Sequence, residues 1–208
     1  MSAPVQASTR AAILELKNEQ LVVNEAYIFL DEKRMLLAAE LLRQLRIYQQ
    51  LNNARGVLHD QSNQAVQSAV MHHGLDGLQV FPAASFEAAT LKQNTHNFMG
   101  VTLVETELST ENVENINTAA ASNPSAKADY CRQLFREIVV QSAVLAGISG
   151  NLYRLLREYR LTERRSRALE NVILPEIEQN LREMSLHLEE LDLEDAIRVY
   201  LQSAAHYE

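Results

Sequence analysis

The sequence predicts an all-α-dominated protein: a long antiparallel two-helix coiled coil formed by the N- and C-terminal helices, with a small insert containing a short helix and a β-hairpin. Three observations support this fold class. Only 6 Gly and 4 Pro occur in 208 residues, so residues that interrupt helices are rare. Apolar residues near both ends of the chain recur at alternating spacings of three and four, the period of a coiled-coil seam. Turn-forming glycines and a proline gather between residues 74 and 100, which favours an insert at that point.

The N-terminal helix is predicted from residues 9–51, which contain neither Gly nor Pro. At 1.5 Å per residue this helix would be roughly 65 Å long, about twice the diameter of a small domain. It therefore needs an equally long partner. Its seam has twelve positions, of which all but Gln20, Arg34 and Gln44 are apolar: Ile13, Leu16, Gln20, Val23, Tyr27, Leu30, Arg34, Leu37, Leu41, Gln44, Tyr48 and Leu51.

The C-terminal helix supplies that partner. Its start is predicted at Asn123 and Pro124, because Asn can cap free amides and proline at the first helical position loses no hydrogen bond. From there helical periodicity continues to about residue 205. The seam consists of Leu145, Ile148, Leu152, Leu155, Tyr159, Thr162, Ser166, Leu169, Ile173, Ile177, Leu181, Met184, Leu188 and Leu191.

An irregularity is predicted around Pro175. Between Leu169 and Leu181 the seam spacing becomes three consecutive fours, which is equivalent to a stutter in a coiled coil. Pro175 lies inside this stretch, lacks an amide hydrogen and crowds the carbonyl of Asn171. Because periodicity resumes at once, we expect a bend or an irregular turn instead of a helix end.

The middle of the chain changes character. Asp60 to His73 is typical of a short helix, with Gly74 as its terminator. Leu78 to Phe81 and Phe98 to Leu108 are predicted to be extended, which favours a hairpin or small sheet. Residues 109–123 are expected to form a polar connection. The predicted organisation is a shaft of residues 8–56 and 124–206 with a globular insert of residues 57–123.

Composition and charge exclude several classes of function. The net charge of -8 argues against nucleic-acid binding, which requires a basic footprint. The longest apolar run, residues 143–148, is far shorter than the roughly 18 residues of a membrane span, and the first residues do not resemble a secretion leader. A single cysteine, Cys131, cannot form an internal disulfide and indicates a reducing compartment.

No pattern of catalytic, cofactor or metal-binding residues is expected. The sequence contains neither a Walker A motif nor a dinucleotide fingerprint. The histidines lack the Glu-x-x-His spacing of a di-iron bundle. Glu183 and His187 are four residues apart, and we interpret them as an exposed pair on a helix face. Cys131 has no histidine at a spacing that would activate it, so a small, partly buried side chain is favoured.

Charge is unevenly distributed in the C-terminal helix. Residues 154–167 hold six arginines and two glutamates, whereas residues 170–208 hold ten acidic residues and two arginines. The basic stretch is either a partner-binding collar or a solvated helix face.

Three stretches stand out from the general helical pattern: TERRSRALENVILP at residues 162–175, LDEKRMLL at residues 30–37, and the pair Gly100 and Val101. Together they resemble the D subunit of the V-type and archaeal-type (V/A) ATPases. The family signature is a Thr-x-Arg-Arg run followed by Ala-Leu-Glu and a proline inside a helix. Leu30, Lys33, Arg34 and Leu37 resemble the first helix of the family, and Gly100 and Val101 its Gly-Val strand. The signature is matched by Thr162, Arg164, Arg165, Ala168, Leu169, Glu170, Val172, Ile173 and Pro175.

The sequence also departs from the family pattern. Ser166 and Arg167 stand where the family usually has Val-Asn, and Val104 or Glu105 stands where a proline usually follows the Gly-Val strand. The chain ends in VYLQSAAHYE, where most members have a lysine-rich tail. These differences indicate a divergent branch.

The resemblance implies a central rotor shaft that transmits torque and is not itself catalytic, with no cofactor. The implied partners are the A and B subunits of the catalytic head, the small F subunit of the central stalk and a subunit connecting to the membrane rotor. The implied location is the cytoplasmic face of a membrane, without a span of its own. Alternatives are a coiled-coil scaffold that binds a partner helix and a metal-containing helical-bundle enzyme. The implied partner-binding residues are Lys33, Arg34, Thr162, Arg164, Arg165, Ala168, Leu169, Glu170 and Pro175.

Overall fold

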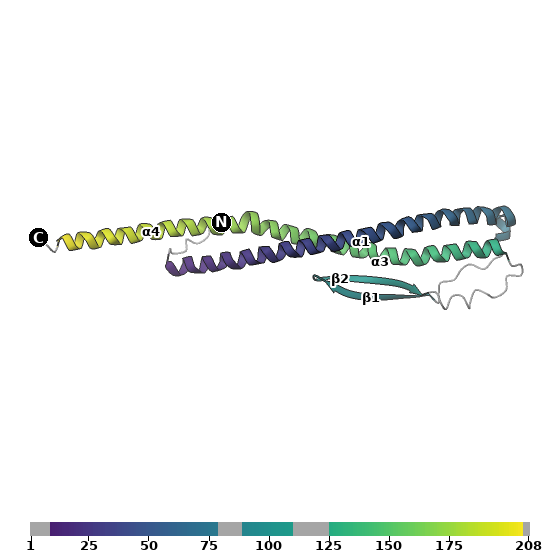
Figure 1. Cartoon of the computed structure of the whole chain (residues 1–208), viewed down its shortest axis with the longest axis horizontal. Helices are drawn as coiled ribbons and strands as arrows, with labels where there is room; N and C mark the ends of the chain where they lie inside the picture. Colours follow the sequence, from purple (N-terminus) through teal and green to yellow (C-terminus); the bar gives the residue numbers. More distant parts are fainter. Residues whose placement is uncertain (1–8, 79–88, 110–124, 206–208) are drawn as a thin grey trace. The chain divides into compact units, whose positions relative to one another are not determined.

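The computed structural model of this protein describes residues 9–78, 89–109 and 125–205. In chain order the elements are helix α1 (Arg10–Leu78), strands β1 (Thr90–Phe98) and β2 (Val101–Ser109), helix α3 (Ala126–Ala168), the π-helical turn η1 (Leu169–Ile173) and helix α4 (Leu174–Ala205) (Figure 1). Long N- and C-terminal helices with a small antiparallel hairpin between them confirm the predicted fold class. None of the helices within the described ranges has a stretch both long and apolar enough to cross a bilayer.

The chain divides into two compact units. Met1–Leu36 and Arg160–Glu208 form one, called here the terminal unit, and Leu37–Tyr159 form the other, called the middle unit. Both boundaries fall inside helices, one within α1 and the other within α3.

The predicted seam of α1 is confirmed. All twelve predicted positions are buried or half-buried, and Leu37 and Gln44 are the most enclosed of them. The burial of one large apolar side chain contributes about 1.5–3 kcal/mol. A row of such contacts therefore holds this helix far more firmly than its helix propensity would.

The seam of the C-terminal helices is confirmed over most of its length. From Leu145 to Leu188 every predicted position is buried or half-buried, but Leu191 is exposed. From Leu191 to Gln202 every residue is exposed, so no apolar side chain of the described residues covers this part of α4.

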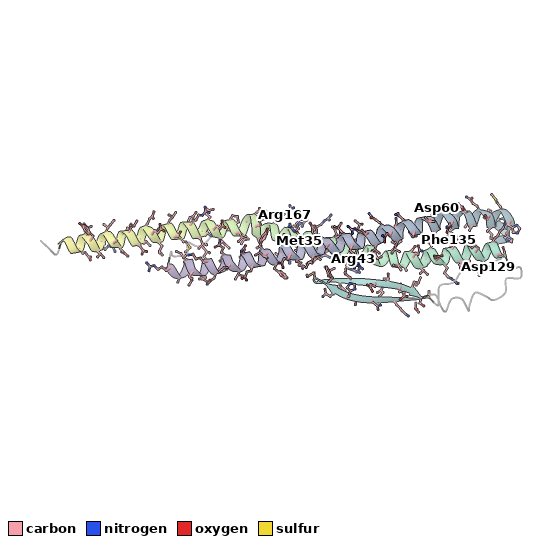
Figure 2. The ribbon with its side chains drawn as sticks, in the orientation of Figure 1. Met35, Arg43, Asp60, Asp129, Phe135 and Arg167 are labelled. Carbon is pink, nitrogen blue, oxygen red and sulfur yellow. The ribbon has the colours of Figure 1, made fainter. Side chains whose placement is uncertain are left out.

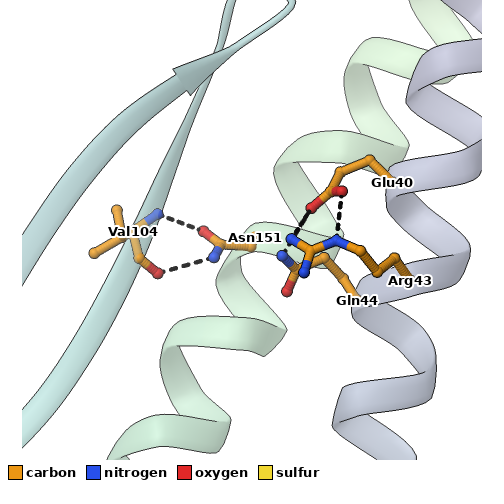
Figure 3. A network of polar contacts seen from close by, with 5 residues as sticks. All are labelled: Glu40, Arg43, Gln44, Val104 and Asn151. Carbon is orange, nitrogen blue, oxygen red and sulfur yellow. Dashed lines mark hydrogen bonds and ion pairs between the residues drawn. The ribbon is translucent and has the colours of Figure 1, made fainter.

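The hairpin packs on the helices of the middle unit. Leu103 and Val101 of β2 join Leu37 of α1 and Leu155 of α3 in a buried cluster. Asn151 of α3 holds the edge of β2, because its side-chain amide both accepts from the Val104 N–H and donates to the Val104 carbonyl, each at 2.8 Å (Figure 3). The hairpin is therefore anchored by an apolar cluster and by a two-point polar contact.

A second contact fixes the hairpin along α3. The Thr106 hydroxyl donates to the Ala143 carbonyl at 2.8 Å. Gly147 lies one turn further on, and a Cβ there would collide with the Thr106 side chain. The glycine thus gives the strand the space to approach the helix.

The two strands of the hairpin are formed partly by other residues than predicted. Leu78 is helical, so the strand expected at Leu78 to Phe81 is wrong at its first residue, and the rest lies outside the described residues. The extended segment Phe98 to Leu108 is confirmed, except that Met99 and Gly100 form the turn. The strand β1 was not predicted, because its sequence TLKQNTHNF is mostly polar and has no apolar alternation.

The helix ends are partly as predicted. Asp60 to His73 is helical and Gly74 is the residue with non-helical angles (φ 69°), but this segment is continuous with the preceding part of α1 and is not a separate helix. The predicted cap Asn123 and Pro124 lie outside the described residues. The observed cap of α3 is Ser125, whose hydroxyl accepts from the Ala128 N–H at 3.4 Å.

The irregular turn expected around Pro175 is confirmed. Residues 169–173 form a π-helical turn, and α4 continues from Leu174 without a break. A wider turn gives the proline ring room at a place where an α-helical hydrogen bond would be missing in any case.

Candidate partner-binding surface

The terminal unit is an antiparallel pair formed by the first part of α1 and the helices that follow Arg160 (Figure 1). Thr162, Ser166 and Ile177 are buried, so the pairing extends on both sides of η1. At the far end of the pair, the Arg10 guanidinium lies 3.0 Å from the Asp192 carboxylate. That ion pair is exposed and contributes only about 0–1 kcal/mol. The apolar seam therefore holds the two helices together.

The structure separates the predicted site residues into three groups. Thr162 is buried and Leu169 is half-buried in the seam, so these two side chains face the neighbouring helix. Lys33 and Arg34 are half-buried, and Arg34 pairs with Asp31 on its own helix. The remaining predicted residues are all exposed and lie on consecutive helical turns: Arg164, Arg165, Ala168, Glu170 and Pro175.

The three arginines before η1 differ in their contacts. Arg167, which Figure 2 labels, donates to the Glu163 carboxylate at 2.7 Å and so is partly neutralised. Arg164 and Arg165 are exposed and make no ion pair or hydrogen bond with the described residues. Two guanidinium groups are thus available to carboxylates of another molecule.

The outer face of α1 carries an apolar stripe. Leu14, Leu21, Ile28 and Met35 repeat every seven residues, and all four are exposed (Figure 2 labels Met35). Each follows a seam position by one residue, so the stripe runs parallel to the seam on the helix surface. We call it the α1 stripe and include three adjacent residues that are 45% to 65% exposed: Val22, Phe29 and Leu36.

A second apolar surface lies on α4 beyond the last seam contact. It includes residues that are 59% to 73% exposed: Leu193, Ile197, Tyr200 and Leu201. Contiguous exposed apolar surface is uncommon in a chain that works alone and marks protein interfaces. The sequence-based prediction followed the seam and missed both surfaces, although the seven-residue repeat of the α1 stripe was a usable signal.

The side chains singled out for possible chemistry do not converge. Among the described residues no group of three or more His, Cys, Asp or Glu side chains could hold a metal ion. Glu183 and His187 are exposed on α4, as predicted, but Glu183 accepts a hydrogen bond from Gln179 and His187 lies 3.7 Å from Glu190, so the two do not pair with each other. Burial raises the pKa of the Cys131 thiol, which makes it less reactive.

These features define an antiparallel two-helix coiled-coil protein with a hairpin insert and with exposed cationic and apolar surfaces suited to other proteins. The family model for the D subunit of ATP synthase matches residues 12–201. The chain therefore belongs to the family of ATP synthase D subunits, as the resemblance of its motifs implied.

Similar proteins include V-type and A-type members of this family. The chain is 25% identical to the D subunit of the V-type ATP synthase of Thermotoga neapolitana, over 93% of this chain and 94% of that protein. It is 26% identical to the D subunit of the A-type ATP synthase of Thermococcus kodakarensis, over 92% and 90%. It is also 26% identical to the A-type D subunit of Methanoregula boonei, over 92% of both chains. The similarity thus extends over nearly the whole of each protein.

Proposed function

We propose that this protein is the central rotor shaft of a rotary V/A-type ATPase. Family membership makes it a subunit of such a complex. In this role the terminal unit lies inside the ring of A and B subunits, and its two helices turn together as one axle. The shaft transmits torque between the catalytic head and the ion-translocating membrane rotor, and it catalyses no reaction itself.

The observation that carries this proposal is the surface of the terminal unit. A protein that worked alone would expose neither the α1 stripe nor the apolar part of α4 to water at this scale. Both surfaces lie on a helix pair whose seam is already filled, so a partner is needed on the outside of the pair. A ring that surrounds the pair would cover both surfaces at once.

The charges of this surface suit a moving contact. Exposed ion pairs contribute only about 0–1 kcal/mol each. Arg164 and Arg165 can therefore exchange carboxylate partners as the shaft turns, without a deep energy minimum at any angle. Apolar contacts are non-directional, and they likewise tolerate rotation.

The middle unit has a different role in the proposal. Its hairpin and the adjoining helices face the membrane rotor and contact the small F subunit and the connecting subunit. The whole chain then lies on the cytoplasmic face of the membrane as a peripheral part of the complex.

The proposal is tested with the assembled complex. The double variant Arg164→Ala and Arg165→Ala is expected to lower coupling between ATP hydrolysis and rotation more than it lowers assembly. The two guanidinium groups are exposed and would contact the ring, whereas the helix pair is held together by its apolar seam. Arg182→Ala, which removes one exposed arginine of α4, is the control and should leave coupling unchanged.

Co-purification gives the coarser test. The full-length chain is expected to purify with large nucleotide-binding subunits. A chain that purified without them, with another helical protein in their place, would show that the coiled coil is a scaffold and would contradict the rotor role.

A further inference from the structure

The carbonyl group of Glu170 lacks both of its possible helical donors. In η1 the Leu174 N–H bonds to the Leu169 carbonyl, a bond to the fifth preceding residue. In an α-helix the same N–H would have bonded to Glu170. The fifth residue after Glu170 is Pro175, which has no N–H. Neither α-helical nor π-helical geometry therefore satisfies this oxygen.

The neighbouring groups add to its acceptor character. The α-helical donor for the Asn171 carbonyl would also be residue 175, so proline removes that bond as well. The Glu170 side chain is exposed and makes no ion pair with the described residues. The Glu170 carboxylate and the carbonyls of Glu170 and Asn171 thus lie on one exposed turn, and no cation among the described residues is bound to the carboxylate.

The turn is firmly placed despite its exposure. Ser166 before it and Ile177 after it are buried in the seam of the terminal unit. Leu169 and Ile173 within it are half-buried. On the outer side, Val172 is 57% exposed and offers an apolar surface beside the acceptors.

We propose that this turn is a docking point for a lysine or arginine side chain of the protein that surrounds the shaft. A cationic head carries several N–H donors and no acceptor, which matches the carbonyl and the carboxylate of Glu170. Its aliphatic stem packs against the exposed valine, as lysine and arginine stems commonly do on apolar surface. The inference rests on the proposed function, because it takes the ring of nucleotide-binding subunits as the partner.

The experiment measures binding of the full-length chain to the isolated ring of nucleotide-binding subunits. Pro175→Ala restores an amide at position 175, which allows an α-helical turn that satisfies both carbonyls. This variant is expected to be at least as stable as the unchanged chain, because proline is unfavourable inside a helix. It should nevertheless bind the ring about tenfold more weakly, the loss typical of a charge-assisted hydrogen bond.

Glu170→Gln tests the carboxylate alone. It keeps the carbonyl and the shape of the turn, so a smaller loss of affinity, about threefold, is expected. Glu178→Gln, which changes an exposed glutamate of α4 outside the turn, is the matched control and should bind as the unchanged chain does.

A photo-crosslinking benzoylphenylalanine in place of Val172 identifies what lies against the turn. The expected product joins the shaft to a ring peptide that contains a lysine or arginine. A peptide without either, or equal affinities for the Pro175→Ala, Glu170→Gln and control variants, would overturn the docking point and leave the rotor role intact. If the unchanged chain failed to bind the ring at all, the proposed function itself would fail.

Discussion

At the scale of single residues, the hairpin turn stores a small strain. Met99 and Gly100 both have positive φ angles, 50° and 85°. Two such residues between paired strands form the turn that best matches the strand twist, and Asn-Gly is the preferred sequence for it. Methionine in this conformation is unfavourable, because its Cβ crowds the backbone.

Met99→Asn is therefore expected to stabilise the protein. Removing the strain should add about 1 kcal/mol to the free energy of unfolding, which corresponds to a rise in Tm of roughly 2–4 °C for a chain of this size. Thermal denaturation followed by circular dichroism measures the change. Met71→Asn, at a position 86% exposed on α1, should lower Tm slightly, because Asn is a poorer helix former than Met. A fall in Tm for Met99→Asn would show that the turn is not strained.

The contacts of Glu40 predict that the stability of the folded protein depends on pH in the acid range. The hydrogen bond from Arg43 lowers the pKa of Glu40, and Gln44 and the charge of His96 lower it further, while burial opposes them (Figure 3). Because the folded-state pKa lies below the unfolded one, the stabilisation is complete above the ordinary value of a glutamate. It is lost as the pH falls through the lowered pKa. The Arg43 side chain is 57% exposed, so less than about 1 kcal/mol is at stake.

Glu40→Gln should accordingly flatten the acid limb of the stability curve. Urea denaturation at a series of pH values below the ordinary pKa of a glutamate is the measurement. Glu189→Gln, an exposed position of α4, is the control that should keep the slope of the unchanged protein. An unaltered acid limb in the Glu40 variant would show that the Arg43 contact does not persist in solution.

At the scale of elements, the hairpin is held because α3 offers a gap and a side-chain amide in the right places. Strand β1 is exposed from Thr90 to Asn97 and gains little from packing. A two-stranded hairpin is marginal by itself in water. The contacts of β2 with Asn151, Ala143 and the buried cluster therefore support both strands.

A pair of glycine variants separates this docking from helix stability. Gly147→Ala should weaken the docking of the hairpin on α3 by about 1–3 kcal/mol, because the new Cβ displaces the Thr106 side chain and breaks its hydrogen bond to the Ala143 carbonyl. Gly150→Ala meets only the Arg154 guanidinium, at 3.8 Å, and should stabilise α3 by up to about 1 kcal/mol. Amide hydrogen exchange in β1 and β2 reports the difference. Adding Thr106→Ala to the Gly147 variant should restore part of the slow exchange, and failure to do so would locate the clash elsewhere.

The elements that sequence could predict are those with a repeating pattern. The seams of α1 and of the C-terminal helices follow from regular apolar spacing, and three fours in succession with Pro175 predicted an irregular turn. Strand β1 could not be found in this way, because its pairing is imposed by β2 and by the turn at Met99. The exposure of Arg164 and Arg165 fits their proposed role, but neither their lack of partners among the described residues nor the free carbonyl of Glu170 can be read from residue spacing.

At the scale of the whole molecule, the two units divide the proposed work. The terminal unit carries the α1 stripe, the two exposed arginines and the π-helical turn, all on a pair of helices with a closed seam. The middle unit carries the hairpin on a second stretch of paired helices. An axle requires that the two helices of a pair do not slide past each other while torque is applied. The seam provides this resistance, because sliding by one turn would expose the buried side chains to water.

Joining the helices of the terminal unit covalently should therefore leave function unchanged. Arg10→Cys and Asp192→Cys place thiols at positions whose present side chains meet at 3.0 Å, and Cys131→Ser removes the native thiol. A bismaleimide about 10 Å long, the span of two such side chains together, should link the pair. The linked chain is expected to assemble and to support ATP-driven turnover at the rate of the unlinked triple variant. A linked chain that assembled normally but turned over more slowly would show that the helices slide during the cycle, and that the terminal unit does not act as a rigid axle.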